Sequence, residues 1–134
     1  MPYPIREIPG IRSETAEFLK KEGIRTTNAF LRATKTPKQR VRMAERAGID
    51  IKLVLEMATA CDRMRIRGVG SEYAQLLGVA GVKTVSDLKL RNPQNLVNSL
   101  EQANNGRLVH VLPKEKMVGR WIENAKKLPA VIRY

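Results

Sequence analysis

The sequence predicts an all-α domain of about eight short helices, built as two repeats related by a pseudo-twofold axis. Three observations predict this architecture: apolar residues recur at helical spacing, start and stop signals divide the chain into short helices, and one stretch is repeated. The 134 residues are enough for a single compact domain. The domain would span residues 1–134. Its two repeats would cover about 5–65 and 66–129, and a short tail would follow at 130–134.

Two segments of the chain match at a constant offset of 58 residues. The matching pairs are Ile8–Leu19 with Ile66–Leu77, Gly23–Thr26 with Gly81–Thr84, and Phe30 with Leu88. Further along, Thr36-Pro37 and Asn92-Pro93 each indicate an N-cap followed by proline at the first helical position. Gly48 and Gly106 indicate the stops of the helices that follow these prolines.

In chain order, these signals predict helices at 13–22, 27–34, 37–47, 51–64, 71–80, 85–91, 93–104 and 114–128. Ser13, Asp50 and Ser71 are the expected N-caps of three of them, and Pro129 ends the last. Residues 109–112 alternate too briefly for a strand, so we expect a loop there.

The fourth helix of each repeat carries the same apolar stripe. Its members are Val54, Met57, Cys61 and Met64 in the first repeat and Val118, Trp121, Ala125 and Leu128 in the second. We therefore expect Trp121 in the core, with Met43, Met57, Met64 and Met117 as filler. Because no helix precedes the first repeat, we also expect helix 114–128 to pack near Ile8 and Ile11, which would close the eight helices into one bundle.

The chain is strongly basic. It has 25 Lys and Arg against 13 Asp and Glu, a net charge of +12 and a pI near 10.4. Both repeats share the excess, which attracts polyanions such as nucleic acids. Solubility through self-repulsion is the alternative interpretation of the charge alone.

Several other classes of function are not indicated. No apolar run approaches the ~20 residues that span a bilayer, and the N-terminus lacks the apolar segment of a secretory signal. We therefore expect a cytoplasmic protein, associated with the nucleoid if it binds DNA, without a membrane partner. His110 has no acid or cysteine near it in sequence, and Cys61 lies on a predicted buried face. We expect no enzyme activity, no metal and no cofactor.

The clearest motif is Arg65-Ile66-Arg67-Gly68-Val69-Gly70-Ser71, between helices 51–64 and 71–80. Two glycines around one apolar residue allow a tight turn, and a buried Val69 would fix that turn to the core. The N–H groups that open the next helix have no internal partner, and with the helix dipole they favour an anion.

The segment Ile66–Leu77 resembles the helix-hairpin-helix motif of DNA repair and recombination proteins. The whole chain also resembles a bacterial family described as a domain of unknown function with two such units. The resemblance implies a hairpin that grips duplex DNA by its phosphates without reading bases. The chain departs from the pattern because Gly10-Ile11-Arg12 lacks the second glycine, and because Glu14 and Glu72 stand where such hairpins often carry lysine. The alternative is that both glycine-containing segments are purely structural turns.

Other cations add positive charge around these turns. Arg65 and Arg67 flank the second turn, and Arg25 and Lys83 hold matching positions in the two repeats. Within helix 37–47 the cations Lys38, Arg42 and Arg46 form a basic stripe, beside an apolar stripe of Val41, Ala44 and Ala47. Ordinary solvated loops and a solvated helix face are the alternatives.

We therefore expect a sequence-independent nucleic-acid-binding module that contacts duplex or structured DNA, with RNA as a further possibility. Aromatic residues make up only 4% of the chain, which disfavours stacking on single strands. The alternative is a protein-interaction or assembly adaptor that binds an acidic protein, a role that the two glutamates favour. The candidate contacts to nucleic acid are Gly10, Arg12, Arg25, Lys38, Arg42, Arg46, Arg65, Arg67, Gly68, Val69, Gly70, Ser71 and Lys83.

Overall fold

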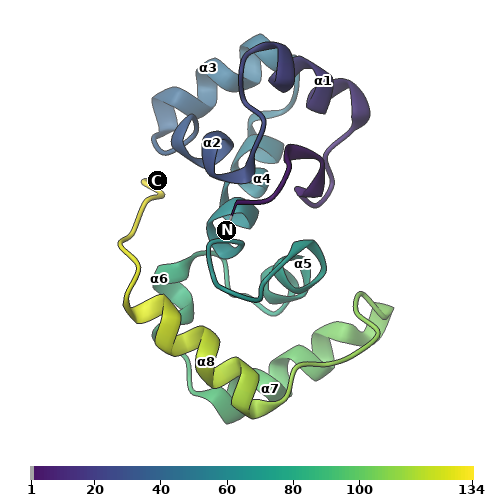
Figure 1. The fold of residues 1–134 in the computed structure, drawn as a ribbon, viewed down its shortest axis with the longest axis vertical. Coiled ribbons are helices and arrows are strands. Elements are labelled where there is room, and N and C mark those ends of the chain that lie inside the picture. The colour runs from purple at the N-terminus through teal and green to yellow at the C-terminus, as the bar shows by residue number, and fades with distance from the viewer. Residues whose placement is uncertain (1) are drawn as a thin grey trace.

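The computed structural model describes residues 2–134, so Met1, which the predicted domain includes, lies outside the described residues. Within them the fold consists of eight α-helices, two single-turn 3₁₀ helices and one isolated β-bridge between Pro4 and Thr26 (Figure 1). The all-α prediction is therefore confirmed. None of the helices in this part of the chain is long and apolar enough to cross a membrane.

The predicted helices all occur, and most of them end earlier than expected. The α-helices are α1 (Ser13–Lys21), α2 (Thr27–Arg32), α3 (Pro37–Ala47), α4 (Ile51–Arg63), α5 (Ser71–Val79), α6 (Val85–Leu88), α7 (Pro93–Ala103) and α8 (Glu115–Lys126), and the 3₁₀ helices are η1 (Ile5–Glu7) and η2 (Asn104–Gly106). The largest difference is α6, predicted over 85–91 but ending at Leu88, after which the N–H groups of Leu90 and Arg91 donate to carbonyls three residues earlier. Residues 109–112 form the expected loop.

Three of the predicted N-caps are confirmed. The side chain of Thr36 accepts a hydrogen bond from the backbone of Gln39, whose own side chain accepts one from Thr36 in return. The side chains of Asn92 and Asp50 accept bonds from backbone N–H groups two or three residues later. These bonds satisfy donors that have no partner within the helix.

Ser13 and Ser71 are not N-caps, because each is the first residue of its helix. The cap positions are held by Arg12 and Gly70, whose side chains make no capping bond. The stop predicted at Gly48 is confirmed by its left-handed backbone. The stop predicted at Gly106 is wrong, since Arg107 takes the left-handed conformation there.

The duplicated turns, residues 8–12 (the first turn) and 66–70 (the second turn), have the same backbone shape. Gly10 and Gly68 lie in the left-handed region with φ of 80° and 90°, a conformation that favours glycine. The following glycine is not required by the backbone, because Gly70 has φ of −94° and Arg12 in the same position has φ of −88°. The absence of a second glycine in the first turn is therefore compatible with the same conformation.

The helices enclose two hydrophobic cores. The first is built from Ile5, Ile8, Ala16, Leu19, Phe30, Leu31, Val54, Met57, Ala58 and Cys61. The second is built from Met64, Ile66, Val69, Ala74, Leu76, Leu77, Val82, Val85, Leu88, Leu96, Leu100, Val109, Val118, Trp121, Ile122 and Ala125. Helix α4 contributes to the first core, and Met64 at its C-cap belongs to the second. It is therefore the element through which the two cores are joined.

Helix α8 packs on α6 and α7, just as α4 packs on α2 and α3. Trp121 lies in the second core with Val69, whereas Ile8 lies in the first core and Ile11 packs against it. The prediction that helix 114–128 packs beside the first turn is therefore wrong. The fourth helix of each half packs instead on the helices that shortly precede it, which is the usual arrangement of consecutive elements.

The C-terminal tail runs back from α8 to the first half of the molecule (Figure 1). The Arg133 N–H donates to the Lys35 carbonyl at 2.8 Å. The guanidinium of Arg40 donates to the carbonyls of Arg133, Lys35 and Thr34. Val131–Ile132 packs against the first core. The tail thus ties the second half of the molecule to the first.

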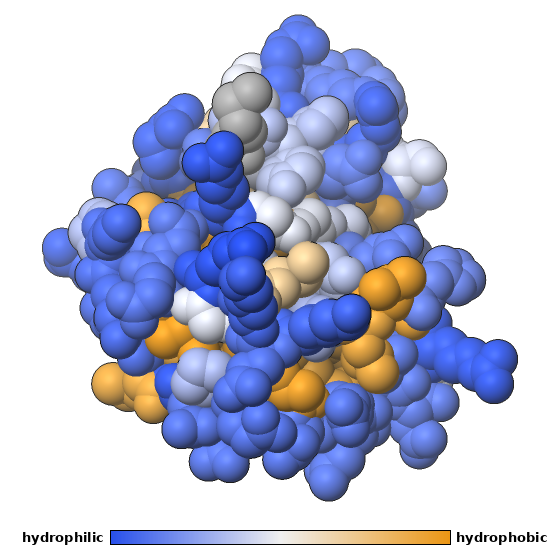
Figure 2. Space-filling view, turned by 60° about the horizontal axis from the view of Figure 1, so that its bottom comes forward, coloured by the Kyte–Doolittle hydropathy of each residue, from blue (hydrophilic) through white to orange (hydrophobic). Residues whose placement is uncertain are grey.

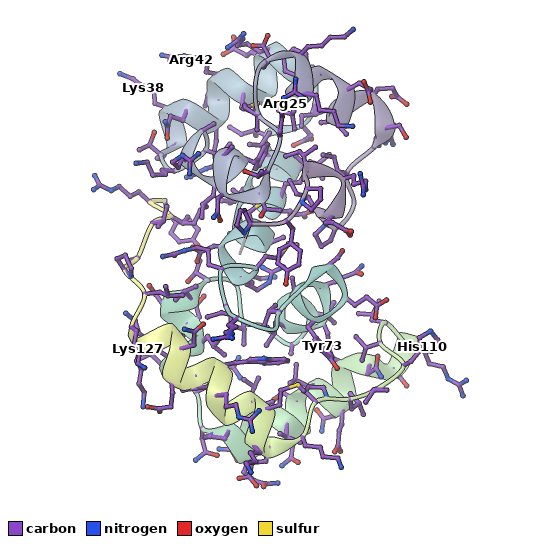
Figure 3. The ribbon with its side chains drawn as sticks, viewed as in Figure 1. Arg25, Lys38, Arg42, Tyr73, His110 and Lys127 are labelled. Carbon is purple, nitrogen blue, oxygen red and sulfur yellow. The ribbon has the colours of Figure 1, made fainter. Side chains whose placement is uncertain are left out.

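Helix α3 is turned differently from the prediction. Val41, placed in the apolar stripe, is 45% exposed, whereas Arg40 is only 4% exposed. Burial lowers the pKa of Arg40, and its three carbonyl acceptors keep the buried charge hydrogen-bonded. Lys38 and Arg42 remain on the surface, as expected (Figure 3).

We expect Arg40→Gln to lower the free energy of unfolding by about 1–3 kcal/mol, because three buried or partly buried carbonyls lose a charged donor. Arg42→Gln is the matched control, since Arg42 is exposed on the same helix, and its stability should match the wild type. Urea denaturation followed by circular dichroism measures both. Equal stability of the two variants would contradict the role of Arg40 in holding the tail.

Cys61 is completely buried, and this burial raises the pKa of its thiol. Because the thiolate is the reactive form, we expect the folded protein to resist thiol-specific reagents. The reaction should become complete, at one thiol per chain, once denaturant unfolds the protein. The reaction is monitored by the absorbance of the thiol-specific reagent. Rapid labelling in native buffer would contradict the burial of this side chain.

Candidate functional site

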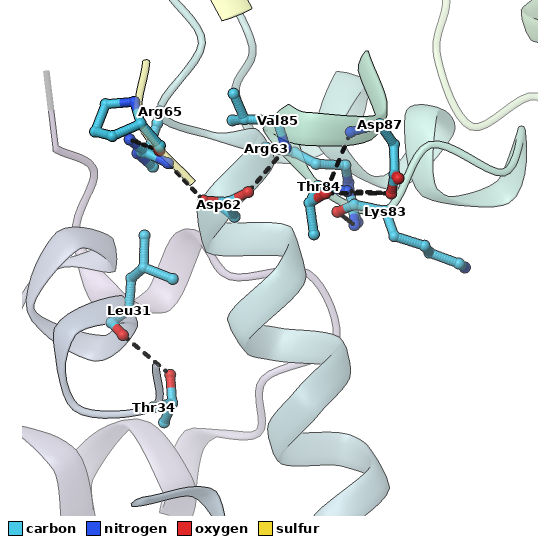
Figure 4. A network of polar contacts seen from close by, with 10 residues as sticks. Leu31, Thr34, Asp62, Arg63, Arg65, Lys83, Thr84, Val85 and Asp87 are labelled. Carbon is cyan, nitrogen blue, oxygen red and sulfur yellow. Dashed lines mark hydrogen bonds and ion pairs between the residues drawn. The ribbon is translucent and has the colours of Figure 1, made fainter. Parts of the chain in front are cut away.

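The second turn follows a buried carboxylate at the end of α4 (Figure 4). Asp62 is 1% exposed. Its Oδ1 accepts a hydrogen bond from Arg65 Nη1 at 2.7 Å, and its Oδ2 accepts one from the Val85 N–H at 2.8 Å. The single side chain therefore links α4 to the start of the turn and to the first residue of α6.

The neighbouring Arg63 links α4 to α5. Its Nε donates to the Ala74 carbonyl at 2.7 Å and its Nη1 to the Lys83 carbonyl at 3.0 Å. Burial lowers its pKa to about 10, opposed by the Asp62 charge, so the guanidinium stays protonated at neutral pH. A Cβ at Gly78 would lie 2.7 Å from this guanidinium, which explains the glycine inside α5.

Arg65, a predicted phosphate contact, is engaged inside the protein. It pairs with Asp62 at 2.7 Å, and its Nη2 donates to the Pro129 carbonyl at 2.9 Å. Only 13% of its side chain is exposed. Arg65 therefore positions the turn and the start of the tail, and its charge is balanced by that of Asp62.

The N-terminus of α5, the anion site expected from the sequence, faces an acidic hollow. This hollow of about 700 Å³ is lined by Tyr3, Glu7, Gly68, Gly70, Ser71, Glu72, Tyr73, Val109, His110 and Val111. Its lining contains two carboxylates, Glu7 and Glu72, and no lysine or arginine. Val69 is buried, as predicted, and the ring of Tyr3 lies close to Gly70. A phosphate at these amides would be repelled by both carboxylates.

Two other hollows are basic. The first includes residues of the second turn, and the second includes Arg65, which precedes that turn. One, of about 330 Å³, is lined by Arg67, Gly68, Met117, Arg120, Trp121 and Asn124. The other, of about 370 Å³, is lined by Asn28, Leu31, Arg32, Lys35, Arg65, Leu128 and Val131. Among the residues the structure describes, no carboxylate lines either hollow. We call their five cations, Arg32, Lys35, Arg65, Arg67 and Arg120, the basic strip.

The remaining candidates lie elsewhere. Lys83 and Gly10 line a separate hollow that also contains Glu56, and the Lys83 Nζ donates to the Gly78 carbonyl. Arg12 lines a hollow with Glu14 and Asp50. Arg25, Lys38 and Arg42 are exposed in the upper half of Figure 3, and Arg46 pairs with Glu22. The predicted contacts therefore do not form one surface.

The structure adds residues that the sequence did not single out, chiefly Arg120 and Asn124 of α8. Trp121 is 2% exposed, which confirms it as a core residue, yet it also lines the smaller basic hollow. Met117, predicted as core filler, is 39% exposed on the same hollow. The sequence signal was available, because Arg120, Asn124 and Lys127 share one helical face, but α8 was assigned to the wrong turn.

Most of the positive charge is not consumed by internal ion pairs. Within residues 2–134, acidic side chains pair with only four of the cations, namely Lys20, Arg46, Arg65 and Lys126. The same residues contain no group of three or more His, Cys, Asp or Glu side chains placed to hold a metal ion. Figure 2 shows the face that carries the lower end of the molecule as mostly hydrophilic, with separate hydrophobic patches.

Comparison with known proteins gives one match. A family model described as "Domain of unknown function (DUF4332)" matches residues 9–128, a span that contains all eight α-helices and most of both turns. No curated protein and no solved structure matches the chain.

We expect Asp62→Asn to lower the free energy of unfolding by about 1–3 kcal/mol, because Arg65 loses its charged acceptor in a partly buried site. Glu101→Gln on α7 is the control, since Glu101 is exposed and should leave stability unchanged. Thermal unfolding of both variants measures the difference. A melting temperature for Asp62→Asn equal to that of the control would show that this carboxylate does not hold the turn.

Proposed function

We propose that this chain, which belongs to the DUF4332 family, is a sequence-independent nucleic-acid-binding module that grips duplex or structured DNA through its phosphates. The observation that carries the proposal is the basic strip. It gathers five cations, of which Arg65 is paired with Asp62, in the linings of two hollows that contain no described carboxylate. The likeness of the two turns and their helices to helix-hairpin-helix units supports the same function.

The strip accounts for binding without base recognition. Arginine and lysine contacts to phosphate oxygens position a protein on nucleic acid but carry no sequence information directly. Each phosphate that is neutralised releases counterions, so affinity should fall steeply with salt. The large excess of unpaired cations elsewhere on the protein would also speed the first encounter.

The proposed mode differs from the one expected from the sequence. The sequence predicts that the free backbone N–H groups at the N-terminus of α5 bind the phosphate. Glu7 and Glu72 line the hollow at those amides, so we place the phosphate chain along the strip instead. The second turn still takes part, through the side chain of Arg67 rather than through the helix N-terminus.

A second candidate is an assembly adaptor for an acidic protein. It is favoured by the acidic hollow at α5, because Glu7 and Glu72 deny that surface to nucleic acid while Tyr3 and Tyr73 line it with apolar area. An acidic protein would use the basic strip in place of a phosphate chain. Failure to bind any nucleic acid at low salt would favour this candidate.

The test compares two double variants that remove the same charge. Arg32→Gln with Arg67→Gln disrupts the basic strip, and Lys38→Gln with Arg42→Gln removes two exposed cations from α3. Fluorescence anisotropy with a short labelled duplex is measured across a series of salt concentrations. The strip variant should lose affinity and flatten the plot of log K against log salt by about 2, at roughly 0.9 per phosphate contact.

The α3 variant should retain the wild-type slope. A flattened slope in the α3 variant and an unchanged one in the strip variant would move the interface to α3. Absence of binding by the wild type to duplex DNA, single-stranded DNA and RNA at low salt would contradict the proposed function itself.

A further inference from the structure

We propose that the hollow between the second turn and α8 is a seat for a single phosphate group. The seat consists of Arg67 and Gly68 on the turn and Arg120, Trp121 and Asn124 on α8. The proposal rests on the proposed function for the source of that phosphate, the backbone of a nucleic acid. It goes beyond the proposed function because it assigns a specific group of hydrogen-bond donors to one phosphate, where the proposed function relies on positive charge in general.

The indole of Trp121 supplies the first donor. The residue is 98% buried, being only 2% exposed, and its N–H makes no hydrogen bond to another residue within 2–134. In that range every fully buried side-chain nitrogen or oxygen has a hydrogen-bond partner. Since Nε1 has none, it is not fully buried and is reached from the hollow that Trp121 lines. A largely buried indole N–H normally has an acceptor, and none of the described residues supplies one, which leaves the donor available to water or a ligand.

Gly68 keeps that donor accessible. A Cβ at this position would lie 3.5 Å from Trp121 Nε1, so a longer side chain would extend over the indole N–H. The φ of 90° also favours glycine. The same residue therefore serves the turn and leaves the approach to the indole open.

Asn124 supplies further donors. Its Oδ1 accepts a hydrogen bond from the Arg67 backbone N–H at 2.9 Å, which ties α8 to the turn. This bond uses the acceptor end of the amide and leaves the two N–H groups of Nδ2 available. The contact fixes the side chain before any ligand arrives, so less ordering is required on binding.

Arg67 and Arg120 supply the charge. Both are exposed, and neither forms an ion pair with a described residue. A guanidinium presents a planar fork of donors that matches two phosphate oxygens. The hollow thus combines donors from four side chains with no carboxylate in its lining, which selects an anion. Its volume of about 330 Å³ is ample for one phosphate group with its remaining water shell.

The only tryptophan of the chain is part of the seat, so its fluorescence reports binding directly. The wild type is titrated with inorganic phosphate and with chloride at constant ionic strength. We expect a saturable change with phosphate alone. The change should be abolished in Arg120→Gln and retained in Arg6→Gln, which removes an exposed arginine from η1. Equal responses to the two anions, or equal responses of the two variants to phosphate, would overturn the seat.

Duplex binding by the same variants separates this proposal from the proposed function. The seat predicts that Arg120→Gln loses several-fold more affinity for duplex than Arg6→Gln. A wild type that responds to phosphate but binds no nucleic acid would retain the seat and overturn the function. Strong duplex binding that is the same in both variants, with no response to phosphate, would overturn the seat and leave the function in place.

Discussion

The buried carboxylate of Asp62 is the constraint on which the arrangement of the second half depends. It accepts from Arg65 and from the first residue of α6, while adjacent Arg63 holds α5 and the following turn. Buried ion pairs add little net stability compared with apolar packing, but losing one partner leaves a costly unpaired charge. We infer that this network chiefly fixes the geometry in which α4 passes from the first core to the second.

The proposed binding surface follows from that geometry. Once α4 and α5 are fixed, the second turn meets α8, where Asn124 binds the Arg67 backbone. Arg120 then lies on the same hollow as Arg67, and the tail leaving α8 completes the second basic hollow with Arg32 and Lys35. The arrangement explains why the positive surface lies beside the turn and not at the helix N-terminus that follows it, where two carboxylates gather.

Much of the fold could be predicted from the sequence, because helical periodicity, caps and the repeat are local signals. The left-handed Gly68 and the burial of Val69 and Trp121 follow from such signals. The packing partner of α8 did not, since an apolar stripe indicates that a face is buried but not against which element. The burial of Arg40 depends on carbonyls as distant as residue 133, and the acidic hollow depends on Glu7 reaching the second turn. Neither contact leaves a local pattern.

The most direct test of the account is a ¹H–¹⁵N NMR titration of the labelled protein with a short duplex. The chain has one tryptophan, so its spectrum contains a single indole N–H resonance, that of Trp121. The account predicts that this resonance and the amides of Arg67 and Gly68 shift most, and that added salt reverses the shifts. Shifts centred on α3, or on the hollow lined by Glu7 and Glu72, with an unmoved indole resonance, would contradict it.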